Sequence, residues 1–234
     1  MSIICEAMMR SPAAAPCSSL STSSRGEGRV LALAAALSYI GLVAGLATMA
    51  AAVYLAASMH PRVPSSDMWS MIDFWARPSQ STIHWLWAQH NEHRIVLSKF
   101  VLLLDYRFFR GREVFAVATA FAAQLSLLAA LLWALRAIAG MRGTLWRSAA
   151  AVTMFSLFTT AQWENFLGGF QAPFFFVGFF LTVGILALLH RRRVETSAGA
   201  GDWNYAAIAV LAGAAATYSM ANGILVWPRR TPRS

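Results

Sequence analysis

The sequence predicts an all-α fold, a polytopic membrane bundle of about five transmembrane helices. Hydrophobic residues make up 58% of the 234 residues and charged residues only 12%, which is about half the charged share of a soluble domain. The apolar residues also form long blocks, since residues 30–59 and 114–135 contain no charged side chain. Each block is long enough to cross about 30 Å of hydrocarbon as an α-helix.

The predicted membrane domain, residues 30–228, follows a flexible leader (residues 1–29) and precedes a short basic tail (residues 229–234). The first apolar block is far longer than the core of a secretory signal, about 7–15 residues, so we expect an uncleaved anchor. Gly168–Pro173, "GGFQAP", is expected to separate the third span from the fourth, because glycine and proline interrupt helices. The predicted spans are residues 30–59, 114–139, 149–163, 172–189 and 205–227.

A long loop, residues 60–113, joins the first two predicted spans. Within it, Ile95–Leu104 is apolar but too short to span, and Lys99 interrupts it. This pattern is typical of a helix that lies in the membrane interface with its lysine reaching water. The tryptophans of the loop are interpreted in the same way, as an aromatic belt.

The arginines of the short loops predict the orientation. With a cytoplasmic N-terminus they all fall on the cytoplasmic side, and the short loop between the third and fourth spans has no Lys or Arg. They are Arg10, Arg25, Arg29, Arg136, Arg142, Arg147, Arg191, Arg192 and Arg193. We therefore expect a plasma-membrane protein whose long loop, Trp163–Phe166 turn and fifth-span end share the extracytoplasmic face.

The formal charge of +9 is also compatible with nucleic-acid binding. Because the arginines lie mainly between the apolar blocks, where topology rather than nucleic acid would place them, the lipid bilayer is the expected partner and nucleic acid is not. The two cysteines, Cys5 and Cys17, both lie in the leader and show no metal-binding spacing.

Two histidines in the loop, His90 and His93, raise the question of a metal site. Three positions apart, they would share one face of a helix, but catalytic zinc needs a third protein ligand. "HNEH" is not the zincin pattern, in which the histidines are four apart, and no cysteine is near. No metal site is assigned, and hydrogen-bonded surface histidines are the alternative.

Four further polar residues on the expected outer face have two interpretations each. Glu92 and Arg94 form either a salt-bridged surface or an anion site, because arginine gives planar, charge-assisted bonds to phosphate. Glu164 lies in an otherwise uncharged stretch, where a carboxylate either ends a helix or serves a site. Asn222 either bonds between helices or joins the same cavity.

Three segments of the chain resemble segments of bacterial multi-spanning membrane proteins associated with the GT-C class of glycosyltransferases. They are "HNEHRIVLSKFVLLLD" (90–105), "QWENFLGGFQAPFFF" (162–176) and "MANGILVWP" (220–228). A single N-terminal anchor and a long first loop with an early aspartate also resemble this class. The resemblance covers about residues 65–228.

The resemblance implies transfer of a sugar from a polyprenyl-phosphate donor to an envelope acceptor on the outer face. By position, Asp67 corresponds best to the loop carboxylate that serves as base or metal ligand, with Glu92 as second choice and Glu164 as a further catalytic candidate. Whether a divalent cation takes part as cofactor is left open. The candidates for substrate binding are Arg94 and Lys99, for the donor phosphate, and His90, His93 and Asn222.

The alternative is a non-catalytic integral membrane protein: a transporter fragment, an assembly partner or a truncated, inactive paralogue. GT-C enzymes have more spans than the five predicted here, and "WPRRTPRS" directly follows the last one, so a truncated product is expected. A transporter would place charges near the bilayer midplane. Here the unexplained charges lie at one rim, which favours chemistry at the membrane surface.

Overall fold

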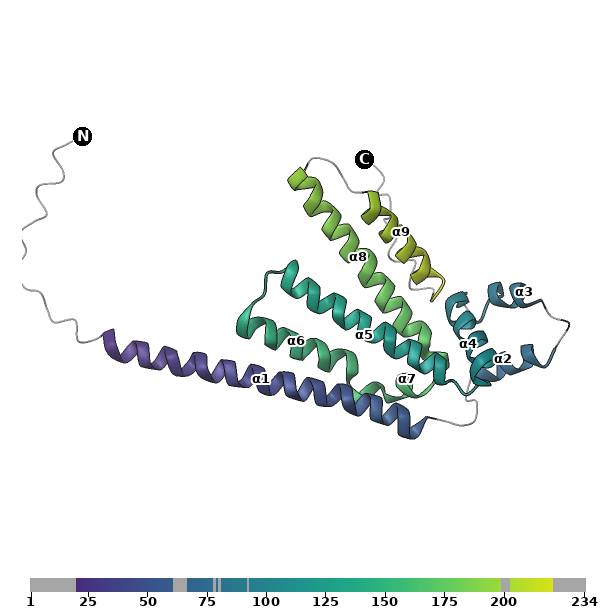
Figure 1. The fold of residues 1–234 in the computed structure, drawn as a ribbon, viewed down its shortest axis with the longest axis horizontal. Coiled ribbons are helices and arrows are strands. Elements are labelled where there is room, and N and C mark those ends of the chain that lie inside the picture. The colour runs from purple at the N-terminus through teal and green to yellow at the C-terminus, as the bar shows by residue number, and fades with distance from the viewer. Residues whose placement is uncertain are drawn as a thin grey trace, which may run out of the picture. The chain divides into compact units, whose positions relative to one another are not determined.

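The computed structural model describes residues 20–60, 67–77, 79, 81–91, 93–198 and 203–220. Every regular element in these ranges is helical and none is a strand, which confirms the all-α class. The helices are α1 (Leu20–Met59), α2 (Met68–Trp75), α3 (Thr82–Trp87), α4 (Val96–Phe109), α5 (Val114–Ala137), α6 (Gly143–Phe158), α7 (Trp163–Leu167), α8 (Ala172–Ala198) and α9 (Trp203–Thr217) (Figure 1). The chain divides into two units after Leu37, and every contact described below lies in the second, residues 38–234.

Three segments are long and apolar enough to cross a membrane: Gly26–Met59, Val114–Ala137 and Gly169–Arg193. Only 11% of the first apolar window and 33% of each of the others is buried within the protein. Most of their apolar surface therefore faces outward, which is stable in lipid but not in water. α6 and α9, at the third and fifth predicted spans, are shorter, with 16 and 15 residues.

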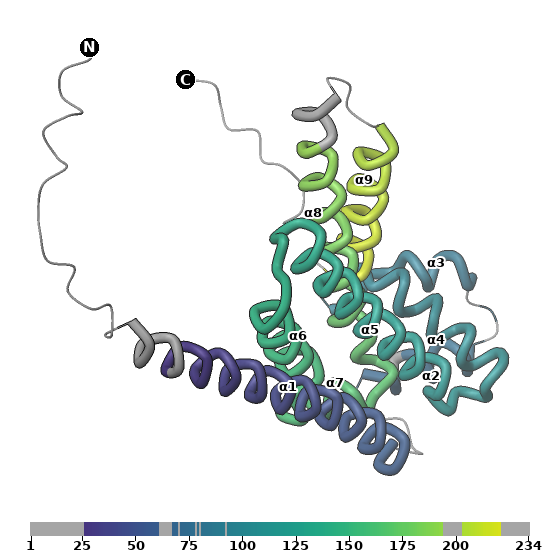
Figure 2. The backbone as a smooth tube through the Cα atoms, turned by 60° about the vertical axis from the view of Figure 1, so that its left-hand side comes forward, coloured from purple at the N-terminus to yellow at the C-terminus, as the bar shows by residue number. Residues whose placement is uncertain are grey.

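The two central helices, α5 and α8, run side by side in the same direction (Figures 1 and 2). Their starts are tied together where Gly169 N–H donates to Glu113 Oε2 at 2.6 Å. Their far ends are tied by Arg193, whose guanidinium donates to the carbonyls of Ala137 and Ile138 at 3.1 and 2.6 Å. This arginine satisfies carbonyl groups that the last turn of a helix leaves without partners.

The shorter helices return the chain toward the starts of α5 and α8. α6 packs back along α5, where Gln124 Nε2 donates to the Leu157 carbonyl at 2.6 Å. α9 packs along α8, and its Tyr205 ring lies 4.6 Å from the His190 ring near the far end of α8. One end of the bundle therefore gathers the starts of α5 and α8 and the ends of α6 and α9.

The third predicted span differs from the helix that forms there. α6 begins at Gly143 and ends at Phe158, rather than at residues 149 and 163. It ends there because Thr159 adopts ψ 132° and its side chain accepts a hydrogen bond from Ala161 N, which starts a 3₁₀ turn. The helix at the fourth predicted span, α8, begins at Ala172, so Pro173 occupies its first turn, where proline is tolerated.

Helix α1 approaches α6 closely at two glycines. A Cβ added to Gly41 would lie 3.2 Å from Ala151 Cβ, and one added to Gly45 would lie 3.1 Å from Met154 Cβ. Glycines four positions apart present a flat strip that lets two membrane helices pack backbone to backbone.

The loop helices α2, α3 and α4 form a small packed layer rather than an open interfacial segment. Phe74 of α2 stacks on Trp85 of α3 with ring centroids 4.3 Å apart, and Trp85 is only 6% exposed. Trp75 stacks on Tyr106 of α4 at 4.0 Å. The aromatic-belt interpretation is therefore wrong for Trp85, which belongs to the protein core.

The expectation that Lys99 reaches water is also wrong, because its side chain is buried, with an exposed fraction of 2%. Its Nζ donates to the carbonyls of Trp85 and Ala88 at 2.9 and 2.6 Å. These carbonyls lie at the end of α3, where helix carbonyls lack partners. Burial lowers the pKa of Lys99, and the ammonium group fastens α3 to α4.

Candidate functional site

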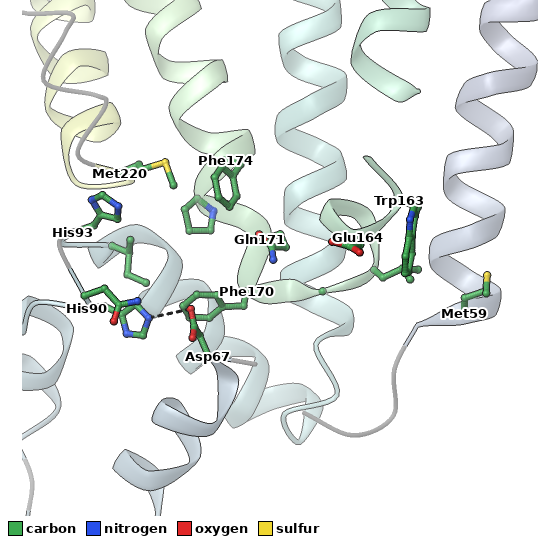
Figure 3. A pocket seen from close by; sticks show the side chains of 15 residues that line it. Met59, Asp67, His90, His93, Trp163, Glu164, Phe170, Gln171, Phe174 and Met220 are labelled. Carbon is green, nitrogen blue, oxygen red and sulfur yellow. Dashed lines mark ion pairs between the residues drawn. The ribbon is translucent and has the colours of Figure 1, made fainter. Parts of the chain in front are cut away.

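A cavity of about 660 Å³ lies at the end of the bundle where α5 and α8 start (Figure 3). Its wall is built from three segments that are far apart in the sequence: the turn at residues 90–95, the stretch from α7 into the first turn of α8, and Met220 after α9. Asp67, at the start of α2, and Met59, at the end of α1, complete it. Residues from segments 90–105 and 162–176, together with Met220, therefore line one cavity.

His90 and His93 lie on a tight turn and not on a helix. Their backbones exchange two hydrogen bonds, His90 N to His93 O at 2.7 Å and His93 N to His90 O at 2.9 Å. The turn requires φ 50° at Asn91, a left-handed conformation that asparagine tolerates better than most residues. The predicted arrangement of the two imidazoles on one helical face is therefore wrong.

Both imidazoles leave a buried ring nitrogen at the cavity. His90 Nε2 and His93 Nδ1 have no hydrogen-bond partner among the described residues. His90 Nε2 lies 3.6 Å from Asp67 Oδ2, which is too long for a good hydrogen bond, and its ring packs against Phe170 with centroids 5.1 Å apart. The His90 imidazole and the Asp67 carboxylate face each other beside Phe170 (Figure 3).

Two carboxylates line the cavity from different walls. Asp67 begins α2 and its side chain is 48% exposed, and Glu164 is an exposed residue in the first turn of α7. Glu164 lies next to Trp163, with Gln171 between it and the Asp67 wall in the view of Figure 3. Exposed carboxylates on a cavity can accept hydrogen bonds from a ligand or take a proton from it.

Arg94 and Lys99 are not among the described residues that line this wall. Arg94 is exposed, and Lys99 is occupied by the two carbonyls at the end of α3. Among the described residues that line the cavity there is no Lys or Arg. Glu92 and Asn222 lie outside the described residues.

A metal site would need a group of ligands that the described part of the chain does not bring together. Within it, no three His, Cys, Asp or Glu side chains are close enough to hold one ion. His90 and Asp67 approach each other in the cavity, with Nε2 and Oδ2 3.6 Å apart.

Sequence reasoning missed Asp105, which is buried at 1% exposure between α4 and α5. Its Oδ1 accepts from Glu113 N at 2.9 Å, and its Oδ2 accepts from Phe115 N at 2.6 Å and Ala116 N at 3.1 Å. These N–H groups open α5, where helices have unsatisfied donors and a partial positive charge. Asp105 therefore caps α5 from the neighbouring helix.

Glu113 plays the matching role for the segment that leads into α8. It is 3% exposed, and its Oε2 accepts the Gly169 N–H at 2.6 Å. A Cβ on Gly169 would lie only 2.6 Å from Ala116 Cβ, so the close approach requires glycine. Burial raises the pKa of Glu113 and nearby Asp105 raises it further, whereas the Gly169 hydrogen bond and nearby His60 lower it.

His60 bridges two backbone carbonyls from distant segments. Its Nδ1 lies 3.0 Å from Leu167 O, and its Nε2 lies 2.6 Å from Arg112 O. Because both partners are acceptors, the ring satisfies both only when both nitrogens carry a proton. We call His60, Asp105 and Glu113 the backbone clamp, since together they hold the segment around Leu167 that forms part of the cavity wall.

A second, apolar cavity adjoins the first. Its volume is about 280 Å³, and it lies between the end of α1, at Leu55 and Met59, and the segment after α6, at Thr160. It shares Met59, Trp163 and Leu167 with the polar cavity. A ligand with a polar head and an apolar chain would find both surfaces side by side.

Comparisons with known proteins assign no family to the chain. No family model matches its sequence, and no curated protein or solved structure matches it significantly.

Proposed function

We propose that the protein is a membrane glycosyltransferase that moves a sugar from a polyprenyl-phosphate donor to an envelope acceptor at the extracytoplasmic end of its bundle. The observation that carries the proposal is the convergence of three distant segments and Asp67 on one polar cavity. The adjoining apolar cavity supports a lipid-linked substrate, because it offers a surface for a hydrocarbon chain beside the polar groups.

Five membrane crossings form part of this proposal. Because α5 and α8 run in parallel, the chain must return between them, and α6 with the turns after it makes that return. α6 alone would span about 24 Å at 1.5 Å per residue, so the residues around Thr160 would complete the crossing. α9 then returns after α8, which supports a bundle of five spans.

The orientation is proposed from the two ends of the bundle. The arginines that follow α5 and end α8 lie away from the cavity, where Arg193 reaches the end of α5. The positive-inside rule puts such a cluster in the cytoplasm. The cavity, the long loop and the end of α1 would then face the outside of a bacterial inner membrane, with the N-terminus inside.

The proposed chemistry uses the cavity carboxylates. The acceptor hydroxyl oxygen forms a bond to the anomeric carbon, and the bond from that carbon to the polyprenyl phosphate breaks. Asp67 takes the hydroxyl proton as general base, and Glu164 orients the acceptor from the opposite wall. Arg94, exposed near the cavity, is the proposed partner of the leaving phosphate.

Transfer can be tested with the full chain in proteoliposomes that contain labelled polyprenyl-phosphate sugars and envelope acceptors. We expect labelled product with the wild type and a loss of about a hundredfold or more in Asp67→Asn, the range of general-base catalysis. The matched control is Asp73→Asn, since Asp73 is exposed on the same helix and pairs with Arg77 in the described part of the chain. Folded wild type that transfers no sugar from any donor would refute the proposal.

A non-catalytic membrane component is the second candidate. It is favoured by the absence of Lys and Arg from the described wall of the cavity, because a phosphate-bearing donor needs cationic partners. It predicts binding of a lipid without turnover, which the same proteoliposomes would reveal.

A further inference from the structure

The charges of the polar cavity restrict what it can bind. Asp67 and Glu164 both present carboxylates to it, and none of its described wall residues is a lysine or arginine. A phosphate in this space would meet the like charge of the exposed Glu164 carboxylate, without a lysine or arginine among the described wall residues to offset it. Like charges repel each other, and the repulsion is strongest where water is partly excluded.

The remaining polar groups suit a ligand that both donates and accepts hydrogen bonds. The amides of Asn91 and Gln171 line the wall, and His90 Nε2 and His93 Nδ1 are buried there without partners among the described residues. A hydroxyl group can donate to a carboxylate and accept from an amide or imidazole N–H. Several hydroxyls on one ligand would satisfy this wall better than a phosphate, which only accepts when ionised.

Apolar rings complete the wall. Trp163, 47% exposed, and Phe174, 49% exposed, face the space along with Phe170. Exposed rings beside polar groups provide a flat surface for the C–H face of a ligand whose edges carry hydroxyls. The apolar cavity shared through Met59 and Leu167 continues from the Trp163 side.

We propose that the polar cavity holds the uncharged, hydroxyl-bearing head of a glycolipid acceptor, whose chain enters the adjoining apolar cavity, and excludes lipid phosphates. This inference rests on the proposed function, for which it names the acceptor class. Glu164 determines the specificity, since its carboxylate accepts hydrogen bonds from hydroxyls and repels phosphate. The donor phosphate then binds outside this cavity.

The test compares two lipids with the same diacylglycerol chains, glucosyl-diacylglycerol and phosphatidylglycerol, on the full chain in nanodiscs. Competition against a labelled glycolipid measures both affinities. We expect the wild type to prefer the glycolipid by about tenfold or more. Glu164→Gln should weaken glycolipid binding by about ten- to a hundredfold, as for the loss of a charge-assisted hydrogen bond, and should narrow the preference over phosphatidylglycerol.

Asp73→Asn is the control, and it should bind the glycolipid like the wild type. Equal or tighter binding of phosphatidylglycerol by the wild type would overturn the inference. So would tighter binding of a third lipid with a trimethylammonium head, which would assign the carboxylates to a cation. A Glu164→Gln protein that is folded but binds the glycolipid normally would also overturn it.

The assay contains no donor and needs no turnover, so it separates the two proposals. Glycolipid binding that depends on Glu164, without sugar transfer, would support the acceptor site and refute the enzyme. Sugar transfer that is insensitive to Glu164 and to the head group of the acceptor would support the enzyme and refute this cavity as its acceptor site.

Discussion

Two pairs of carboxylates lie at the same end of the bundle and differ in their surroundings. Asp105 and Glu113 are 1% and 3% exposed, and backbone N–H groups occupy their oxygens. Asp67 and Glu164 are exposed to the polar cavity. The first pair holds helix starts together, and the second pair lines the cavity.

The difference follows from the cost of burying a carboxylate. A buried charge is tolerated only with several hydrogen bonds, and the starts of α5 and of the segment before α8 supply N–H donors that would otherwise lack partners. The described residues supply no comparable set of donors to Glu164, at the exposed surface of α7. The hydrogen-bond partners of an acidic residue near an apolar span therefore indicate whether it holds the backbone or lines a site.

The largest expected effect comes from removing the cap of α5. Asp105→Ala leaves three backbone N–H groups without their acceptor, and we expect a loss of about 3 kcal/mol or more in the free energy of unfolding. Glu164→Ala, at an exposed position, should change it by less than about 0.5 kcal/mol. Reversible unfolding in mixed micelles measures both. Equal effects of the two substitutions would remove the distinction between the pairs.

A smaller effect is expected at the donor that Glu113 binds. Gly169→Ala places a Cβ 2.6 Å from Ala116 Cβ, and overpacking of this kind costs about 1–3 kcal/mol. Gly168→Ala is the matched control, since its Cβ would lie 3.8 Å from its nearest neighbour, an ordinary contact. Thermal unfolding of the two variants in the same detergent compares them. A neutral Gly169→Ala would show that the close approach of this segment to α5 is not needed.

The smallest effect is the pH dependence contributed by Glu113. Because burial raises its pKa above the ordinary 4.5, the folded protein binds this proton more tightly than the unfolded chain does. The resulting stabilisation is complete below about pH 4.5 and is lost as pH rises through the raised pKa. Glu113→Gln removes this dependence, so its stability relative to the wild type should increase with pH in that window.

Unfolding at several pH values checks this prediction, with Asp73→Asn as the exposed control. A constant difference between wild type and Glu113→Gln across the window would contradict it. The slope would then belong to other groups of the backbone clamp.

The sequence alone determined the helical class and the ranges of the main apolar helices. Residues 114–135 lack charge, and α5 runs over Val114–Ala137, because a segment of that length and composition has no other way to satisfy its backbone in lipid. It also singled out Asp67, His90, His93 and Glu164, which line one cavity. Gly41 and Gly45 carried a further readable signal, the spacing at which α1 meets α6.

Only the tertiary structure decided which polar groups face a ligand and which face the backbone. Lys99 was itself a site candidate, and Asp105 carries the same charge as the candidate carboxylates. The partners of both are backbone groups of other helices: carbonyls for Lys99 and N–H groups for Asp105. Local sequence does not encode such partners, because every residue has the same backbone groups. Packing alone brings a particular peptide group within about 3 Å of a particular side chain. Such contacts distinguish the residues of the backbone clamp from the residues that line the cavity.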